Sequence, residues 1–189
     1  MSTRSWVGLW SPLLCEAQAL AQHSRTGDLI ARSAAAIILA RTAWDCFINE
    51  FIELRRLPRE LKLKDFNEKI AAVLAALDQA PPTYHAKSVW ADLDHVNALR
   101  NAIVHHRAEE TASDAQVARW FGKLDGNGLV SGRITDPWER RCLNTKVAVW
   151  CCEVVGTAIV ALEQCPKLRR RSLDLVRAQV QHCLKKTAH

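Results

Sequence analysis

The chain has 189 residues, of which 49% are hydrophobic and 24% are charged, with only 7 Gly and 6 Pro. Such a composition can bury one core of ordinary size, which excludes a disordered chain. The net charge is +6, and residues 166–189 account for all of it, with seven Lys/Arg against Asp174 alone. The basic character therefore belongs to an expected C-terminal helix over 167–186, which could bind nucleic acid phosphates or simply lie in solvent.

The seven cysteines are an odd number and include no Cys-x-x-Cys pair. This usage is typical of reduced, buried thiols in a cytoplasmic protein, and not of a disulfide framework. Cys142, Cys151 and Cys152 do not predict a metal site, because neighbouring residues on a helix point about 100° apart and cannot converge on one ion. We expect a cytoplasmic protein with no metal and no cofactor.

The first half of the chain has the apolar spacing of helices. A first helix is expected over 11–24, with Ser11 as N-cap and Pro12 at its first helical position, which also interrupts the apolar run that a signal peptide would need. A long second helix is expected over about 28–56, ended by a proline. Its middle, residues 34–40, is apolar on every side, so we expect this helix at the centre of the protein.

Three more helices are expected before the glycine-rich segment. Asp65 and Glu68 have the spacing of a capping box that starts a short helix to about residue 77. The next helix is expected over about 83–106. The same capping pattern at Ser113 precedes a further short helix.

The segment near 122–134 holds several glycines and predicts an irregular stretch or a small hairpin, the only place where strand is expected. A second long helix is expected over about 136–165, and a last one over about 168–185. The apolar run 147–162 is shorter than the ~20 residues that a bilayer needs, so we expect a core helix and no membrane association. The whole chain, 1–189, is therefore predicted to be one all-α domain, an up-and-down helical bundle with two long central helices.

The helix over 83–106 carries the residues that point to a function. At about 100° per residue, Arg100 falls near the middle of its apolar face, whereas Asn101 and His105 lie together on the edge of that face, one turn apart and near Asn97. A guanidinium stays charged at ordinary pH, and burying it without a partner is costly. Arg100 therefore needs an exposed cleft, a bound anion or a carboxylate, for which Asp45 on the long second helix is a candidate.

The sequence Arg100-Asn101-x-x-x-His105 resembles the Arg-x(4–6)-His motif of the HEPN superfamily, in the form with Asn directly after Arg. Arg-to-His spacing alone is not specific, because Arg177 and His182 show it too. The resemblance covers the motif, the helical class and the long helices on either side, about 27–165. It implies an HEPN-like all-α core, an endoribonuclease activity without metal, and a role as a toxin or defence effector.

The resemblance also implies a mechanism and partners. His105 would exchange a proton with the RNA 2′-hydroxyl or the leaving 5′-oxygen, Arg100 would hold the phosphate, and Asn101 would orient the scissile group or the His105 ring. The products would be a 2′,3′-cyclic phosphate and a 5′-hydroxyl. A homodimer would bring two motifs into one composite site, and an antitoxin or other regulatory partner could control it.

The two residues after the motif, His106 and Arg107, affect what the resemblance implies. His106 could replace His105 in the cleft, although helical geometry favours His105, which shares an edge with Asn101. Arg107 stands where HEPN toxins that are silenced by nucleotidyltransferase antitoxins carry a modified tyrosine, so that regulation is not expected here. Two other hypotheses stay open: a non-catalytic HEPN-like module that binds RNA, nucleotide or a protein, and a plain helical interaction protein in which Arg100 is paired internally.

Overall fold

The computed structural model describes residues 8–22, 28–79, 88–105, 121–133, 135–164 and 170–185, and within these ranges it contains no strand. The predicted all-α class is thus confirmed. The helices are α1 (Trp10–Gln22), α2 (Leu29–Leu54), the 3₁₀ helix η1 (Arg59–Leu63), α3 (Phe66–Ala76), α4 (Val89–His105), α6 (Trp138–Cys142), α7 (Thr145–Glu163) and α8 (Arg170–Lys185). Residues 121–126 are also helical.

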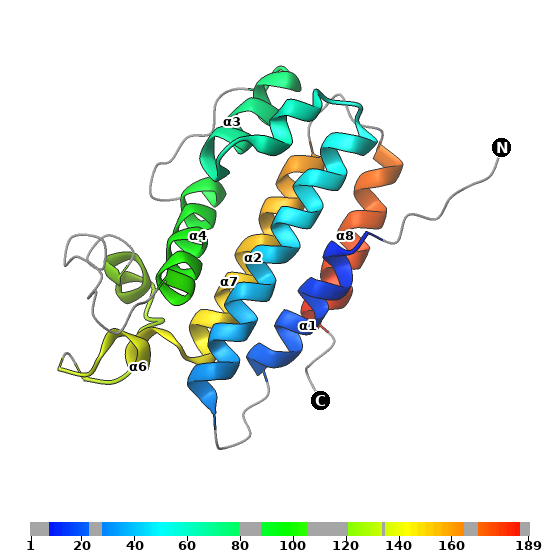
Figure 1. Ribbon diagram of the computed structural model, residues 1–189. Helices are drawn as coiled ribbons and strands as arrows, with labels where there is room; N and C mark the ends of the chain where they lie inside the picture. The colour runs from blue at the N-terminus through cyan, green and yellow to red at the C-terminus, as the bar shows by residue number, and fades with distance from the viewer. Residues whose placement is uncertain are drawn as a thin grey trace.

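The bundle is built around α2 and α7, which run in the same direction at its centre (Figure 1). In Figure 1, α4 covers one side of this pair, α1 and α8 cover the other, and all three run the opposite way. The arrangement agrees with the predicted up-and-down bundle with two long central helices. Because α2 touches helices on both sides, its side chains contribute to two separate regions of the surface.

Helix α7 is central because nearly all of its faces are apolar. Val147, Val155 and Ile159 are fully buried, whereas Glu153 points to solvent. By length and composition this helix could cross a membrane, but it is mostly buried inside the bundle, as expected of a core helix. Gly156 lets α8 approach closely, because a Cβ there would lie only 2.8 Å from Val180 Cγ1.

The helix boundaries differ from the prediction in three places. The expected helix over 136–165 is two helices, because the Asn144 side chain accepts the Val147 backbone N–H at 3.0 Å and starts α7 anew. Helix α1 begins at Trp10, so Ser11 is not its N-cap. The expected capping box of α3 does not form, since Asp65 makes no side-chain cap hydrogen bond. The expected cap at Ser113 lies outside the described residues.

The glycine-rich segment is irregular, and its described residues form no hairpin strands. Gly128 and Gly132 have φ angles of 66° and 81°, a left-handed backbone that glycine adopts without strain. Asp136 closes the turn by accepting the Arg133 backbone N–H at 2.7 Å. The segment therefore joins the 121–126 helix to α6 through tight turns.

The prediction that all cysteines are free thiols is wrong for two of them. Cys15 on α1 and Cys183 on α8 form a disulfide, with their Cα atoms 4.3 Å apart. Spacing alone could not have revealed this pair, because 168 residues separate its members. Cys142 and Cys152 are buried free thiols as expected, and burial raises the pKa of each to about 12.

The disulfide should stabilise the fold, since it closes a loop of almost the whole chain in the unfolded state. We expect Cys15→Ser, or a reducing agent, to lower the free energy of unfolding by about 3–5 kcal/mol, measured by chemical denaturation. Cys46→Ser, which alters a half-buried free thiol, is the control and should have a small effect. Equal unfolding midpoints with and without reductant would contradict the pairing.

Candidate functional site

Among the described residues, Arg41 in the middle of α2 is a buried arginine. Only 6% of the residue is exposed. Its guanidinium Nη1 lies 2.6 Å from Asp45 Oδ2 one turn along the helix, and its Nε donates to Asn97 Oδ1 of α4 at 3.0 Å. The guanidinium carbon also lies 4.1 Å from the centre of the Phe66 ring at the start of α3. Arg41 thus ties three helices together.

These contacts compensate a charge that is costly to bury. Burial lowers the pKa of Arg41, the neighbouring Asp45 raises it, and the positive charge of Arg100 lowers it further. The guanidinium nevertheless stays protonated at any ordinary pH. The positive charge of Arg100 thus acts on Arg41, and such repulsion is unfavourable unless an anion offsets it.

The helical wheel places Arg100 near the middle of the apolar face of its helix, but the residue is not buried there. Leu99 is buried, but Arg100 is partly exposed, and its Nη1 donates to Asn101 Oδ1 at 3.0 Å. The alternative that Arg100 pairs with Asp45 is not realised, because the ion pair of Asp45 is made with Arg41. Arg100 and Asn101 therefore form one polar unit at the surface of α4.

Lys69 is a third positive side chain in the same group as Arg41 and Arg100. Lys69 of α3 donates to Asn49 Oδ1 at 3.3 Å, and its pKa is lowered by burial and by the charges of Arg41 and Lys62, against a raising effect of Asp45. We call Arg41, Asp45, Lys69 and Arg100 the cationic cluster. It holds three positive side chains and one carboxylate, and Asp45 is 48% exposed, so solvent reaches it. Such an excess of charge favours binding of an anion.

The other predicted residues are placed as follows. Asn97 belongs to the cluster's hydrogen-bond network through Arg41. His105 is the last residue of α4 and is exposed, one turn beyond the exposed Asn101. Within the described residues, no hydrogen bond or ion pair joins His105 to Arg100 or Asn101. His106 and Arg107 lie outside the described residues.

Sequence reasoning missed Arg41, although a signal existed. Ile37, Trp44 and Ile48 are fully buried core residues, and position 41 falls on the same stripe of α2 at three-and-four spacing. A charged residue within that stripe should have been noticed in the same way as Arg100. Lys69 gave no such signal, because it lies on a short helix whose position is set only by tertiary packing.

Comparisons with known protein families, with curated protein sequences and with solved structures find no match.

The network of Arg41 should matter for stability much more than Arg100 does. We expect Arg41→Ala to lower the free energy of unfolding by about 2–4 kcal/mol, because it leaves Asn97 and Asp45 without their partner. Arg100→Ala should change it by less than about 1 kcal/mol, since among the described residues Arg100 bonds only to its neighbour at the surface. Denaturant titration measures both. Equal effects of the two variants would contradict the different roles described here.

Proposed function

We propose that this protein is a metal-independent endoribonuclease of the HEPN type, which binds the phosphodiester backbone of RNA at the cationic cluster. The observation that carries the proposal is the Arg100–Asn101 unit, which lies one helical turn before His105 and whose positive charge acts on the buried Arg41. Cations around a solvent-accessible carboxylate supply the charge that a phosphate needs, and Arg100 can grip two phosphate oxygens with its fork of N–H groups.

The residues present can perform the cleavage as follows. The RNA 2′-hydroxyl attacks the adjacent phosphorus and loses its proton to a histidine acting as base, while the P–O5′ bond breaks. The leaving 5′-oxygen takes a proton from an acid, giving a 2′,3′-cyclic phosphate and a 5′-hydroxyl. Arg100 stabilises charge on the phosphate oxygens, and Asn101 holds the Arg100 side chain in place. His105 is the base or the acid.

One chain supplies one His105, so a second histidine has to come from elsewhere. We propose a homodimer in which two copies place their Arg100, Asn101 and His105 residues across one cleft. The exposed position of these residues at the end of α4 supports this arrangement, because a second copy could reach them. As a defence effector or toxin, the enzyme would be held in check by an antitoxin or another regulatory partner.

A second candidate is a non-catalytic module that binds RNA through the same cluster. The observation in its favour is the separation of His105 from the Arg100–Asn101 pair among the described residues. In this case the cluster holds a phosphate, but no proton is transferred. The two candidates therefore differ only in cleavage, and not in RNA binding.

The test is cleavage of a fluorescent single-stranded RNA in the presence of EDTA. We expect the wild type to cleave it, an identical DNA strand to resist, and Arg100→Ala and His105→Ala each to lose at least about 100-fold in rate, since each removes a group acting in the transition state. Circular dichroism should show that both variants stay folded.

The chain offers a matched control in α8, where Arg177 and His182 have the same spacing but lie far from the cluster. The double variant Arg177→Ala/His182→Ala should keep the wild-type rate. RNA binding without cleavage under any condition would favour the non-catalytic module. Cleavage that survives in Arg100→Ala and His105→Ala would rule out the proposed active site.

A further inference from the structure

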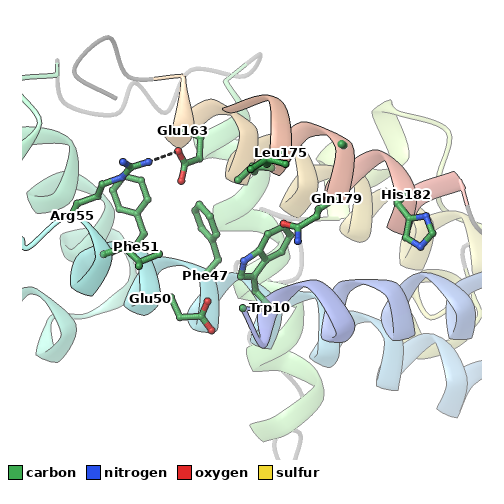
Figure 2. Close-up of a pocket in the computed structure, with 13 residues that line it drawn as sticks. Trp10, Phe47, Glu50, Phe51, Arg55, Glu163, Leu175, Gln179 and His182 are labelled. Carbon is green, nitrogen blue, oxygen red and sulfur yellow. Dashed lines mark hydrogen bonds and ion pairs between the residues drawn. The ribbon is translucent and has the colours of Figure 1, made fainter. Parts of the chain in front are cut away.

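A second hollow lies on the other side of α2, between the start of α1, the C-terminal half of α2, the end of α7 and the outer helix α8 (Figure 2). Its volume is about 660 Å³, within the range of cavities that hold small organic ligands. Arg41 and Glu50 are nine residues apart, which places them about 180° apart around α2. This cavity is therefore distinct from the cationic cluster.

One wall of the cavity is aromatic. The Trp10 and Phe47 rings meet edge to face with centroids 5.6 Å apart, and the Phe51 ring follows 5.8 Å from Phe47. Leu54 and Leu175 line the cavity from α2 and α8 with 54% and 69% of their surface exposed. The Trp10, Phe47 and Phe51 rings are only 2–5% exposed and form the floor of the cavity, whereas Leu54 and Leu175 supply exposed apolar surface for a ligand body.

More carboxylates than guanidinium groups line the cavity. Glu163, which is buried, is paired with Arg55 at 2.7 Å, and this pair forms one end of the cavity. Glu50 is a second carboxylate, and its Oε1 accepts the Leu9 backbone N–H at 2.9 Å. The two carboxylates of Glu50 and Glu163 thus outnumber the one guanidinium of Arg55 among the groups labelled in Figure 2.

Glu50 is held in place and partly removed from water. A Cβ at Gly8 would collide with Glu50 Oε2 and with the Trp10 ring, so both groups lie directly against the bare backbone of Gly8. Burial raises the pKa of Glu50, the Leu9 N–H lowers it, and Glu53 raises it further. A positive charge beside Glu50 would be attracted to a carboxylate that is partly shielded from water.

The aromatic wall already accepts a cation within the protein. The guanidinium carbon of Arg55 lies 5.4 Å from the centre of the Phe51 ring, inside the distance at which a ring face attracts positive charge. Phe47 and Trp10 continue the same wall toward Glu50. A ligand ammonium between these rings and Glu50 would interact with the aromatic rings and with the Glu50 carboxylate at the same time.

We propose that this cavity is a binding site for a small organic cation with an aromatic or aliphatic body, its ammonium beside Glu50 and its body against Trp10, Phe47 and Phe51. Fatty acids and nucleotides do not fit, because their anionic groups would face the carboxylate of Glu50. The site is independent of the proposed ribonuclease activity, since it uses the opposite face of α2.

The test uses tryptamine, an indole with a two-carbon ammonium chain, and indole-3-propionate, which carries a carboxylate on the same ring and linker. Isothermal titration calorimetry of the full chain should show tryptamine binding with a dissociation constant of about 1 mM or lower. Indole-3-propionate should bind at least about tenfold more weakly, because its charge opposes Glu50.

Two variants locate the site. Glu50→Gln should weaken tryptamine binding about tenfold or more, because it removes the charged hydrogen-bond partner but keeps the shape. Ala178→Phe should abolish binding, since this exposed residue of α8 lines the cavity and a ring there would fill it. Thermal melting checks that both variants fold. Glu68→Gln, on the exposed face of α3, is the matched charge control and should bind like the wild type.

Three results would overturn the proposal. They are absence of tryptamine binding to the wild type, equal binding of the cationic and anionic probes, and unchanged binding in both Glu50→Gln and Ala178→Phe. RNA cleavage and tryptamine binding are measured separately, so failure of one leaves the other intact.

Discussion

The burial of Arg41 is the constraint on which the candidate site depends. A guanidinium that is only 6% exposed must have its charge balanced, or the fold would lose several kcal/mol. Asp45 supplies the charge, Asn97 accepts a hydrogen bond and Phe66 covers the guanidinium. Because these partners come from α2, α4 and α3, satisfying Arg41 also fixes how the three helices pack.

This packing has a consequence for the surface. It sets the register of α4 against α2, which brings Arg100 near Arg41 and leaves the Arg100–Asn101 pair facing solvent. The single carboxylate of Asp45 cannot balance three cations, so the cationic cluster keeps an attraction for anions. The opposite face of α2 has a different character, since Glu50 lines a cavity there together with Trp10, Phe47 and Phe51. One helix thus separates a positive region from a negative one.

Much of the fold could be predicted from the sequence, because it follows from local patterns. The apolar spacing of α2 and α7 and the proline after α2 were sufficient to find the central helices. The break before α7 was missed because Asn144 lies in an otherwise continuous helical pattern, and only the hydrogen bond that it accepts from Val147 shows that it is a cap. The Cys15–Cys183 disulfide depends on the docking of the first helix onto the last, which no local pattern encodes.

The candidate site was predicted in part. The sequence drew attention to Arg100, Asn101 and His105, and the structure joins the first two but leaves the third apart among the described residues. The candidate pair of Arg100 with Asp45 does not form, because Asp45 pairs with Arg41. The helical wheel of α4 alone cannot tell which arginine of two neighbouring helices is closer to that carboxylate. Residues on different helices come together through tertiary contacts, and local sequence patterns do not predict these contacts.

The salt dependence of RNA binding tests most directly whether the cationic cluster binds phosphates. A single-stranded RNA with 2′-methoxy groups, which cannot be cleaved through the 2′-oxygen, would be titrated at several salt concentrations. If the cationic cluster holds phosphates, Lys69→Ala and Arg100→Ala should each reduce the slope of log K against log salt by about 0.7, while Arg177→Ala on α8 should leave it unchanged. An unchanged slope in the cluster variants, with a reduced slope in Arg177→Ala, would contradict the account.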